Sequence, residues 1–76
     1  MREKVLTILT EIRPDVEFEQ EENLIDDEIL DSFDVIQIVT EFMEQFGIYI
    51  DADDIEPENL NSVENMIELI ESKQNA

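Results

Sequence analysis

The sequence contains no cysteine and no histidine. The chain therefore has no thiol nucleophile, no disulfide and no Ser-His catalytic pair, and it lacks the usual zinc ligands. Glycine occurs once and proline twice. Because β-sandwiches and barrels need many turns built from these residues, their scarcity favours an all-α protein. The apolar runs are only a few residues long, which is too short for membrane insertion.

Positive charge is also scarce. The chain has 4 Lys and Arg residues against 22 Asp and Glu residues, so its formal net charge is −18. DNA, RNA and anionic membranes are bound through cationic side chains that neutralise phosphates, so the composition argues against these partners. It favours proteins with basic surfaces, and fast, salt-sensitive association with them. Self-repulsion of this size also favours a monomer.

The length of 76 residues indicates one small domain, residues 1–76. Hydrophobic residues make up 42% of the chain, which is enough for a folded core despite the charge. A core this thin stabilises a protein by only a few kcal/mol. No signal peptide is visible at the N-terminus, so we expect a cytoplasmic protein.

The spacing of apolar residues predicts four helices, at about residues 2–13, 32–46, 52–56 and 62–73, of which the third is short. Residues 14–30 form a long connection, and we expect its apolar residues to fold back over the core. The predicted fold class is therefore all-α, a small bundle of three main helices plus one short helix with a long first loop.

Each main helix is expected to bury one apolar face. Pro14 and Gly47 suit the ends of the first and second helices. Asn61 and Glu64 suggest a capping box at the start of the last helix, and Ile48 or Ile50 is expected to fill the core from an extended segment. The predicted core residues of the three helices are Val5, Ile8, Leu9 and Ile12, then Val35, Ile36, Val39, Phe42, Met43 and Phe46, then Val63, Met66, Ile67 and Ile70.

The start of the second helix, EILDSFDVIQIV at residues 28–39, carries an unusual group of side chains. Asp31 suits the N-cap and Asp34 the first turn. Ser32 then lies at the first helical position, where its hydroxyl is not needed for capping and points outward. Phe33 falls on the polar face, where an aromatic side chain has no cover. These side chains fit a surface on which Ser32 carries an attached group and a partner protein docks. An ordinary N-cap serine remains an alternative.

The segment EILDSFDVIQIVTEFMEQFGIYI resembles the phosphopantetheine attachment segment of the acyl carrier protein family, which has Asp-Ser-Leu or a close variant at the start of its second helix. The resemblance covers nearly the whole chain, because the acidic first loop, the late short turn and the final helix NSVENMIELI follow the family's order. It implies a four-helix carrier fold in which coenzyme A donates 4′-phosphopantetheine to Ser32. The thiol of that arm would carry acyl or aminoacyl groups as thioesters, in a chain with no thiol of its own.

The sequence departs from the family pattern at three places. Phe33 replaces the usual Leu, Ile29 and Leu30 stand where a Gly is common, and Gln37 occupies a position at which fatty-acid carriers usually have an acid. The segment ILDSF is similar to the D-alanine carrier proteins that serve teichoic acid modification, and also to dedicated carriers of specialised biosynthetic pathways. Primary fatty-acid synthesis, D-alanylation and specialised biosynthesis therefore all stay open as pathways.

The resemblance implies a non-catalytic carrier that is the substrate of a phosphopantetheinyl transferase. We expect no catalytic residue and no metal site in the chain, because it has no general base suited to the transfer and the transferase would supply both the base and Mg²⁺. Acyl-loading and acyl-processing enzymes would dock through basic surfaces. The predicted partner-binding residues are Asp31, Phe33, Asp34, Gln37, Glu41, Glu44 and Ile55.

Other functions fit the sequence less well. A calcium-binding EF-hand that started at Asp51 would need an oxygen ligand, Gly and Glu at its fifth, sixth and twelfth positions. This chain has Ile55, Glu56 and Ser62 there. A hydrolase would need a pocket around its paired carboxylates, which a solvated acidic face does not provide. An acidic helical interaction module or adaptor with no prosthetic group remains the alternative to a carrier.

Like-charge repulsion predicts that the fold is weak at low ionic strength. Added NaCl, Mg²⁺ or Ca²⁺, or mild acidification, is expected to raise the melting temperature because each reduces repulsion between carboxylates. Thermal unfolding followed by circular dichroism over these conditions measures the effect. A melting temperature that moves with neither salt nor divalent ions would contradict the prediction.

Overall fold

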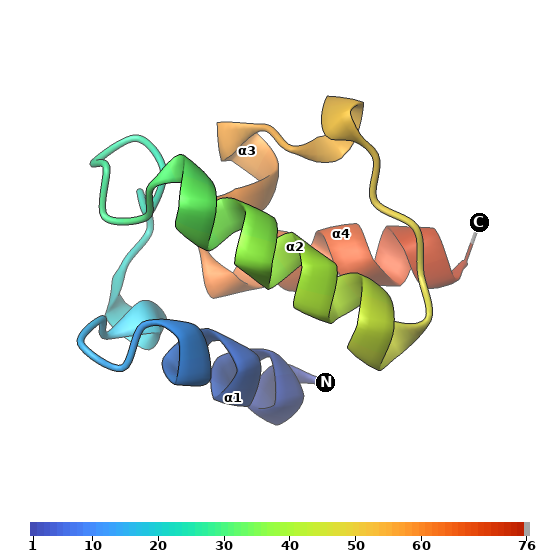
Figure 1. Ribbon diagram of the computed structural model, residues 1–76, viewed down its shortest axis with the longest axis horizontal. Helices are drawn as coiled ribbons and strands as arrows, with labels where there is room; N and C mark the ends of the chain where they lie inside the picture. Colours follow the sequence, from blue (N-terminus) through green and yellow to red (C-terminus); the bar gives the residue numbers. More distant parts are fainter. Residues whose placement is uncertain (76) are drawn as a thin grey trace.

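The computed structural model describes residues 1–75 as a set of helical segments joined by loops, with no strand among these residues (Figure 1). The long helices are α1 (Arg2–Ile12), α2 (Ser32–Phe46) and α4 (Val63–Gln74), and the short elements are η1 (Phe18–Gln20), η2 (Ala52–Asp54) and α3 (Pro57–Leu60). The prediction of a small all-α bundle is confirmed. The bounds of α2 are those predicted from the sequence, and α1 ends one residue earlier than expected.

The three long helices all contact one another, and α3 packs against α4 (Figure 1). One core lies between them. Phe42 at its centre is completely buried, and its ring meets that of Phe46 edge to face with centroids 6.1 Å apart. The largest fully buried side chains are Val5, Leu9, Leu24, Ile38, Phe42, Val63, Met66 and Ile70.

The long first loop covers one end of the core, as expected. Phe18, Leu24 and Leu30 are buried there. Asn61, which precedes α4, holds the loop in place: its Oδ1 accepts hydrogen bonds from the backbone N–H groups of Ile25 and the next residue at 2.9 and 3.1 Å. Its backbone carbonyl accepts another from Leu24 at 2.9 Å. The loop is therefore fixed by packing and by backbone hydrogen bonds together.

The predicted capping box of Asn61 with Glu64 is wrong, because Asn61 bonds to the first loop instead. Ser62 is the N-cap of α4, and its Oγ accepts a hydrogen bond from the backbone N–H of Asn65 at 3.1 Å. The core face of α4 includes the buried Leu69 in addition to the predicted residues, and Ile67 is only half-buried.

The segment between α2 and α4 differs in part from the prediction. Ile50 enters the core from an extended stretch, as expected. The short helix expected at residues 52–56 is the turn η2, which ends at Asp54. Helix α3 was not predicted; it has four residues, and its one local signal is Pro57 at the first helical position.

One predicted core residue of α2 lies outside the core. Ile36 is 62% exposed, whereas Ile38, which was not predicted to be buried, is 1% exposed. Helices α1 and α4 pack on the side of α2 that carries Val35, Ile38, Val39 and Phe42. Ile36 is rotated away from this side, so that it joins Phe33 on the outer face one turn along the helix.

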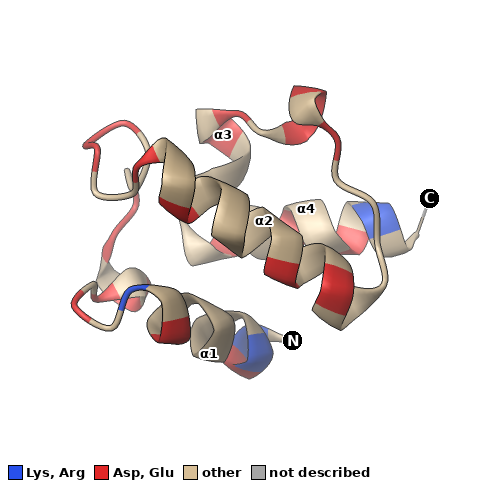
Figure 2. Ribbon diagram, in the orientation of Figure 1, with Lys and Arg blue, Asp and Glu red and all other residues tan. Residues whose placement is uncertain are grey.

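All four Lys and Arg residues, whose positions are blue in Figure 2, bond to another segment of the fold. Because long cationic side chains pair over many geometries, such bridges form where two segments meet. Three of them lie away from the α2 N-terminus: Arg2 to Glu64 at 2.7 Å, Lys73 to Asp54 at 2.7 Å, and Lys4 to the carbonyl of Gln45 at 3.1 Å.

Hydrogen bonds from Lys73 and Arg2 lower the pKa values of Asp54 and Glu64 below their ordinary range. The pKa of Glu56 is raised, mainly by a hydrogen bond with Glu58. On mild acidification Glu56 is therefore protonated before the paired carboxylates. The ion pairs stabilise the fold at pH values above the pKa values that these carboxyl groups have in the unfolded chain. This stabilisation is lost only as the pH falls through their lower pKa values in the folded protein.

The two isoleucines of α2 provide a matched test of the core. Ile38→Val is expected to lower the free energy of unfolding by roughly 0.5–1.5 kcal/mol, since it removes a buried methyl group. Ile36→Val is expected to change it by less than about 0.5 kcal/mol, because that side chain is exposed. Urea unfolding of both variants measures the difference. Equal effects of the two substitutions would contradict this assignment of faces.

Candidate functional site

The N-terminus of α2 is capped by the residues on either side of Ser32. Asp31 is the N-cap, and its Oδ1 accepts a hydrogen bond from the backbone N–H of Asp34 at 2.8 Å. Asp34 Oδ2 in return accepts a longer one from the backbone N–H of Asp31 at 3.4 Å. Ser32 lies at the first helical position and is exposed. Within residues 1–75 its hydroxyl takes part in no hydrogen bond, and the helix is capped by Asp31 instead.

Arg13, which follows α1, reaches the same helix end. Its Nη1 donates to Asp34 Oδ2 at 2.6 Å and to the carbonyl of Ile29 at 3.1 Å. Its Nε and Nη2 donate to the two carboxylate oxygens of Asp15 at 3.0 and 2.9 Å. These last bonds hold the pKa of Asp15 below its ordinary value. The acidic start of α2 is thus paired with one cationic side chain, that of Arg13.

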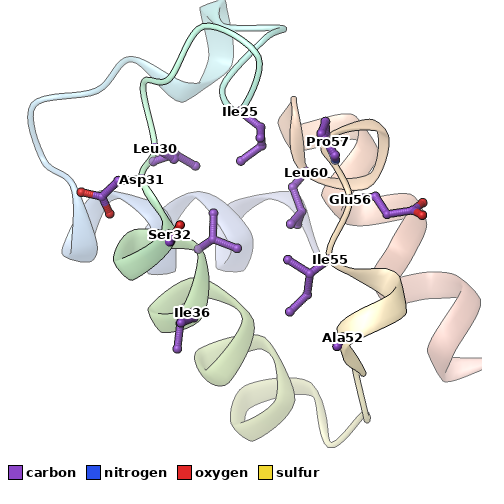
Figure 3. Close-up of a pocket in the computed structure, with 11 residues that line it drawn as sticks. Ile25, Leu30, Asp31, Ser32, Ile36, Ala52, Ile55, Glu56, Pro57 and Leu60 are labelled. Carbon is purple, nitrogen blue, oxygen red and sulfur yellow. The ribbon is translucent and has the colours of Figure 1, made fainter.

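A groove of about 440 Å³ opens beside Ser32. Ser32 and Ile36 lie on its α2 side, and Ile55 and Leu60 lie opposite (Figure 3). Most of the lining is apolar, with carboxylates only at Asp31 and Glu56. The lining residues are Ile25, Leu30, Asp31, Ser32, Val35, Ile36, Ala52, Ile55, Glu56, Pro57 and Leu60. The groove can therefore hold an apolar group attached near Ser32.

The groove does not continue into the core. The space behind it, among Leu30, Val35, Ile38, Leu60 and Met66, has no volume open to a water molecule. Buried apolar side chains from the three long helices and from the loops form one continuous core behind this wall. A ligand at Ser32 therefore meets a closed core wall in this conformation.

The predicted partner-binding residues lie around the site with different exposures. Asp31, Gln37 and Glu44 are exposed, and Phe33 is 63% exposed, while Glu41 is half-buried. Ile55 is 38% exposed and lies across the groove from α2.

Asp34 is among the predicted partner-binding residues, but its side chain is only 13% exposed and is paired with Arg13. Two residues near the site were missed. Ile36 had a signal, because it lies three residues after Phe33 on the same helix face. Arg13 had none, because it is 21 residues away from Asp34 in the sequence.

The described residues 1–75 contain no helix with the length and apolarity needed to cross a bilayer. Nor do three or more metal-ligating side chains converge anywhere among them.

Comparison with known families gives one match. The model of the family described as the phosphopantetheine attachment site matches residues 2–70. The matched range runs from the start of α1 into α4 and includes Ser32 and the groove. No curated protein and no solved structure shows a significant match to the chain.

The capping geometry separates the roles of two adjacent residues. Asp31→Ala is expected to lower the free energy of unfolding by roughly 0.5–2 kcal/mol, because it removes the acceptor for the N–H of Asp34. Ser32→Ala is expected to change it by less than about 0.5 kcal/mol, since the Ser32 hydroxyl has no partner. Urea unfolding checks both values. If Ser32→Ala proved the more damaging substitution, Ser32 would be a structural cap.

Proposed function

The chain belongs to the phosphopantetheine attachment site family, and we propose that Ser32 is the residue that carries the prosthetic group. Members of this family are carrier proteins whose cofactor is a covalently attached 4′-phosphopantetheine. One observation carries the assignment to Ser32. Its hydroxyl is exposed and free of hydrogen bonds at the start of a helix that its neighbours already cap. The residues present therefore fit the group.

Attachment requires a transfer from coenzyme A. A bond forms between Ser32 Oγ and the phosphorus that bears the pantetheine, the bond from that phosphorus to the nucleotide breaks, and the hydroxyl proton leaves to a base. The chain has no histidine, and the carboxylates beside Ser32 are held in the helix cap and the pair with Arg13. A phosphopantetheinyl transferase therefore supplies the base, and this chain presents the nucleophile.

The outer face of α2 is the docking surface for that transferase and for the enzymes that load and process the cargo. Phe33 and Ile36 together give it an exposed apolar centre. Gln37, Glu41 and Glu44 continue along the helix, and the two glutamates complement a basic partner surface. Figure 2 shows acidic residues along α2. In such an interface the apolar side chains supply most of the affinity, and the carboxylates mainly set the association rate and its salt dependence.

The groove and the closed core favour small cargo. An apolar group on the arm lies against Ile36 and Ile55 in a groove that is open to solvent. A long acyl chain would need space inside the bundle, and the wall behind the groove has none. We therefore assign short acyl or aminoacyl thioesters to this carrier. The proposal includes a cytoplasmic location and a place in fatty-acid or specialised biosynthesis.

The proposal is tested by the intact mass of the purified protein after incubation with coenzyme A, Mg²⁺ and a broad-specificity phosphopantetheinyl transferase. The wild type is expected to gain one phosphopantetheine unit and Ser32→Ala none, because Ser32 is the one residue among residues 1–75 that presents a free hydroxyl at a helix start. Ser72→Ala is the matched control, since it removes a hydroxyl on α4, and it is expected to be modified like the wild type.

The absence of a mass gain would contradict the proposal. If a folded wild-type sample gained no mass with several such transferases, Ser32 would not be an attachment residue. The acidic face of α2, with its apolar centre, would then belong to an interaction module that has no prosthetic group.

A further inference from the structure

The guanidinium group of Arg13 contacts the chain on both sides of Ser32. One nitrogen, Nη1, donates to the carbonyl of Ile29 at 3.1 Å and to Asp34 Oδ2 at 2.6 Å. Ile29 lies three residues before Ser32, and Asp34 lies two residues after it. The same side chain therefore fixes the last part of the first loop and the first turn of α2 relative to each other.

Arg13 is itself held in one orientation. Asp15 accepts two parallel hydrogen bonds from its Nε and Nη2, at 3.0 and 2.9 Å. A paired arrangement of this kind fixes the plane of the guanidinium group, which a lysine ammonium cannot reproduce. The remaining nitrogen is thereby directed at Ile29 and Asp34.

The pair with Asp34 is better shielded than the other ion pairs among residues 1–75. The Asp34 side chain is 13% exposed, whereas the carboxylates of the other three pairs are 22%, 61% and 64% exposed. Exposed pairs contribute little because water and salt screen them, and shielded ones are screened much less. Of the four pairs, the contact of Arg13 with α2 therefore has the carboxylate that water and salt screen least.

The pair also changes the charge next to Ser32. Asp31 and Asp34 flank the hydroxyl, and both would repel the phosphates of coenzyme A. The one positive charge of Arg13 is shared between Asp34 and Asp15, so it offsets part of the negative charge beside Ser32 and leaves Asp31 exposed. The side chain thus lowers the repulsion that the incoming phosphoryl group meets.

Given that Ser32 is the attachment residue, we propose that Arg13 is a positioning residue for the transfer. It holds residues 29–34 in the conformation that presents the Ser32 hydroxyl to the transferase. Without it, the transferase would have to order this segment itself, and a misplaced nucleophile reacts more slowly even when it is bound.

The test is the steady-state kinetics of modification with coenzyme A, Mg²⁺ and the transferase, at a temperature at which circular dichroism shows every variant folded. Arg13→Gln is expected to lower kcat/KM for the carrier about tenfold, mostly in kcat, because it frees the segment that bears the nucleophile. The KM for coenzyme A is expected to stay unchanged. Arg13→Lys is expected to recover part of the loss, because an ammonium can pair with Asp34 but cannot also hold the fork with Asp15.

The matched control is Arg2→Gln. It breaks another ion pair between segments, Arg2 with Glu64 at 2.7 Å on α1 and α4, and it leaves the start of α2 intact. This control is expected to keep kcat within about twofold of the wild type, because its effect is on general stability alone. If Arg13→Gln and Arg2→Gln behaved alike, Arg13 would be a structural residue only and the inference would be wrong.

A second readout does not depend on the transferase. Amide hydrogen exchange of Asp34 and Val35 is expected to speed up in Arg13→Gln and to stay unchanged in Arg2→Gln. If Arg13→Gln did not fold, Asp15→Asn would replace it, since it loosens the guanidinium and keeps its charge, and an intermediate loss of kcat is expected. Unchanged exchange and kcat would overturn the inference while Ser32 stayed the attachment residue. A wild type that gained no mass, or a Ser32→Ala that did, would overturn both.

Discussion

The repulsion among 22 acidic residues is the constraint on which the rest of this structure depends, and four cationic residues oppose it. Each cationic side chain bonds one segment to another against this repulsion. The bonds join α1 to α4, α1 to α2, α4 to η2, and the end of α1 to the start of α2. Because every Lys and Arg is used in this way, none is left on the outer face of α2. The proposed attraction of basic partners and the predicted weakness of the fold at low salt have the same electrostatic origin.

The contact of Arg13 with Asp34 links this constraint to the functional site. Ser32 lies at a helix end that is held by its own cap, by the first loop and by a side chain from the end of α1. In the proposed carrier, the presentation of the hydroxyl therefore depends on the packing of α1 as well as on local sequence. Phe33 and Ile36 are exposed on the same helix because its other side is occupied by the core.

The bounds of α2 could be predicted because their signals are local: Asp31 caps the start, and Gly47, at φ 64, ends the helix in the left-handed conformation that glycine readily adopts. Helical spacing gives the angle between two side chains but not the sector that neighbouring helices cover, which is why Ile36 was placed in the core and Ile38 was not. Asn61 and Arg13 bond to groups 35 and 21 residues away, and no local pattern announces such partners.

The proposed separate roles of the core and the groove follow from the small size and the high negative charge of the chain. A domain of 76 residues has a thin core, and here that core also has to offset a net charge of −18. Opening it to hold a long acyl chain would separate side chains such as Ile38 and Met66, which now leave no space open to a water molecule, and each lost contact would lower the free energy of unfolding. A groove outside the core accepts cargo without that cost. In the proposed carrier, the interior therefore serves stability, and the surface between α2 and Ile55 serves the cargo.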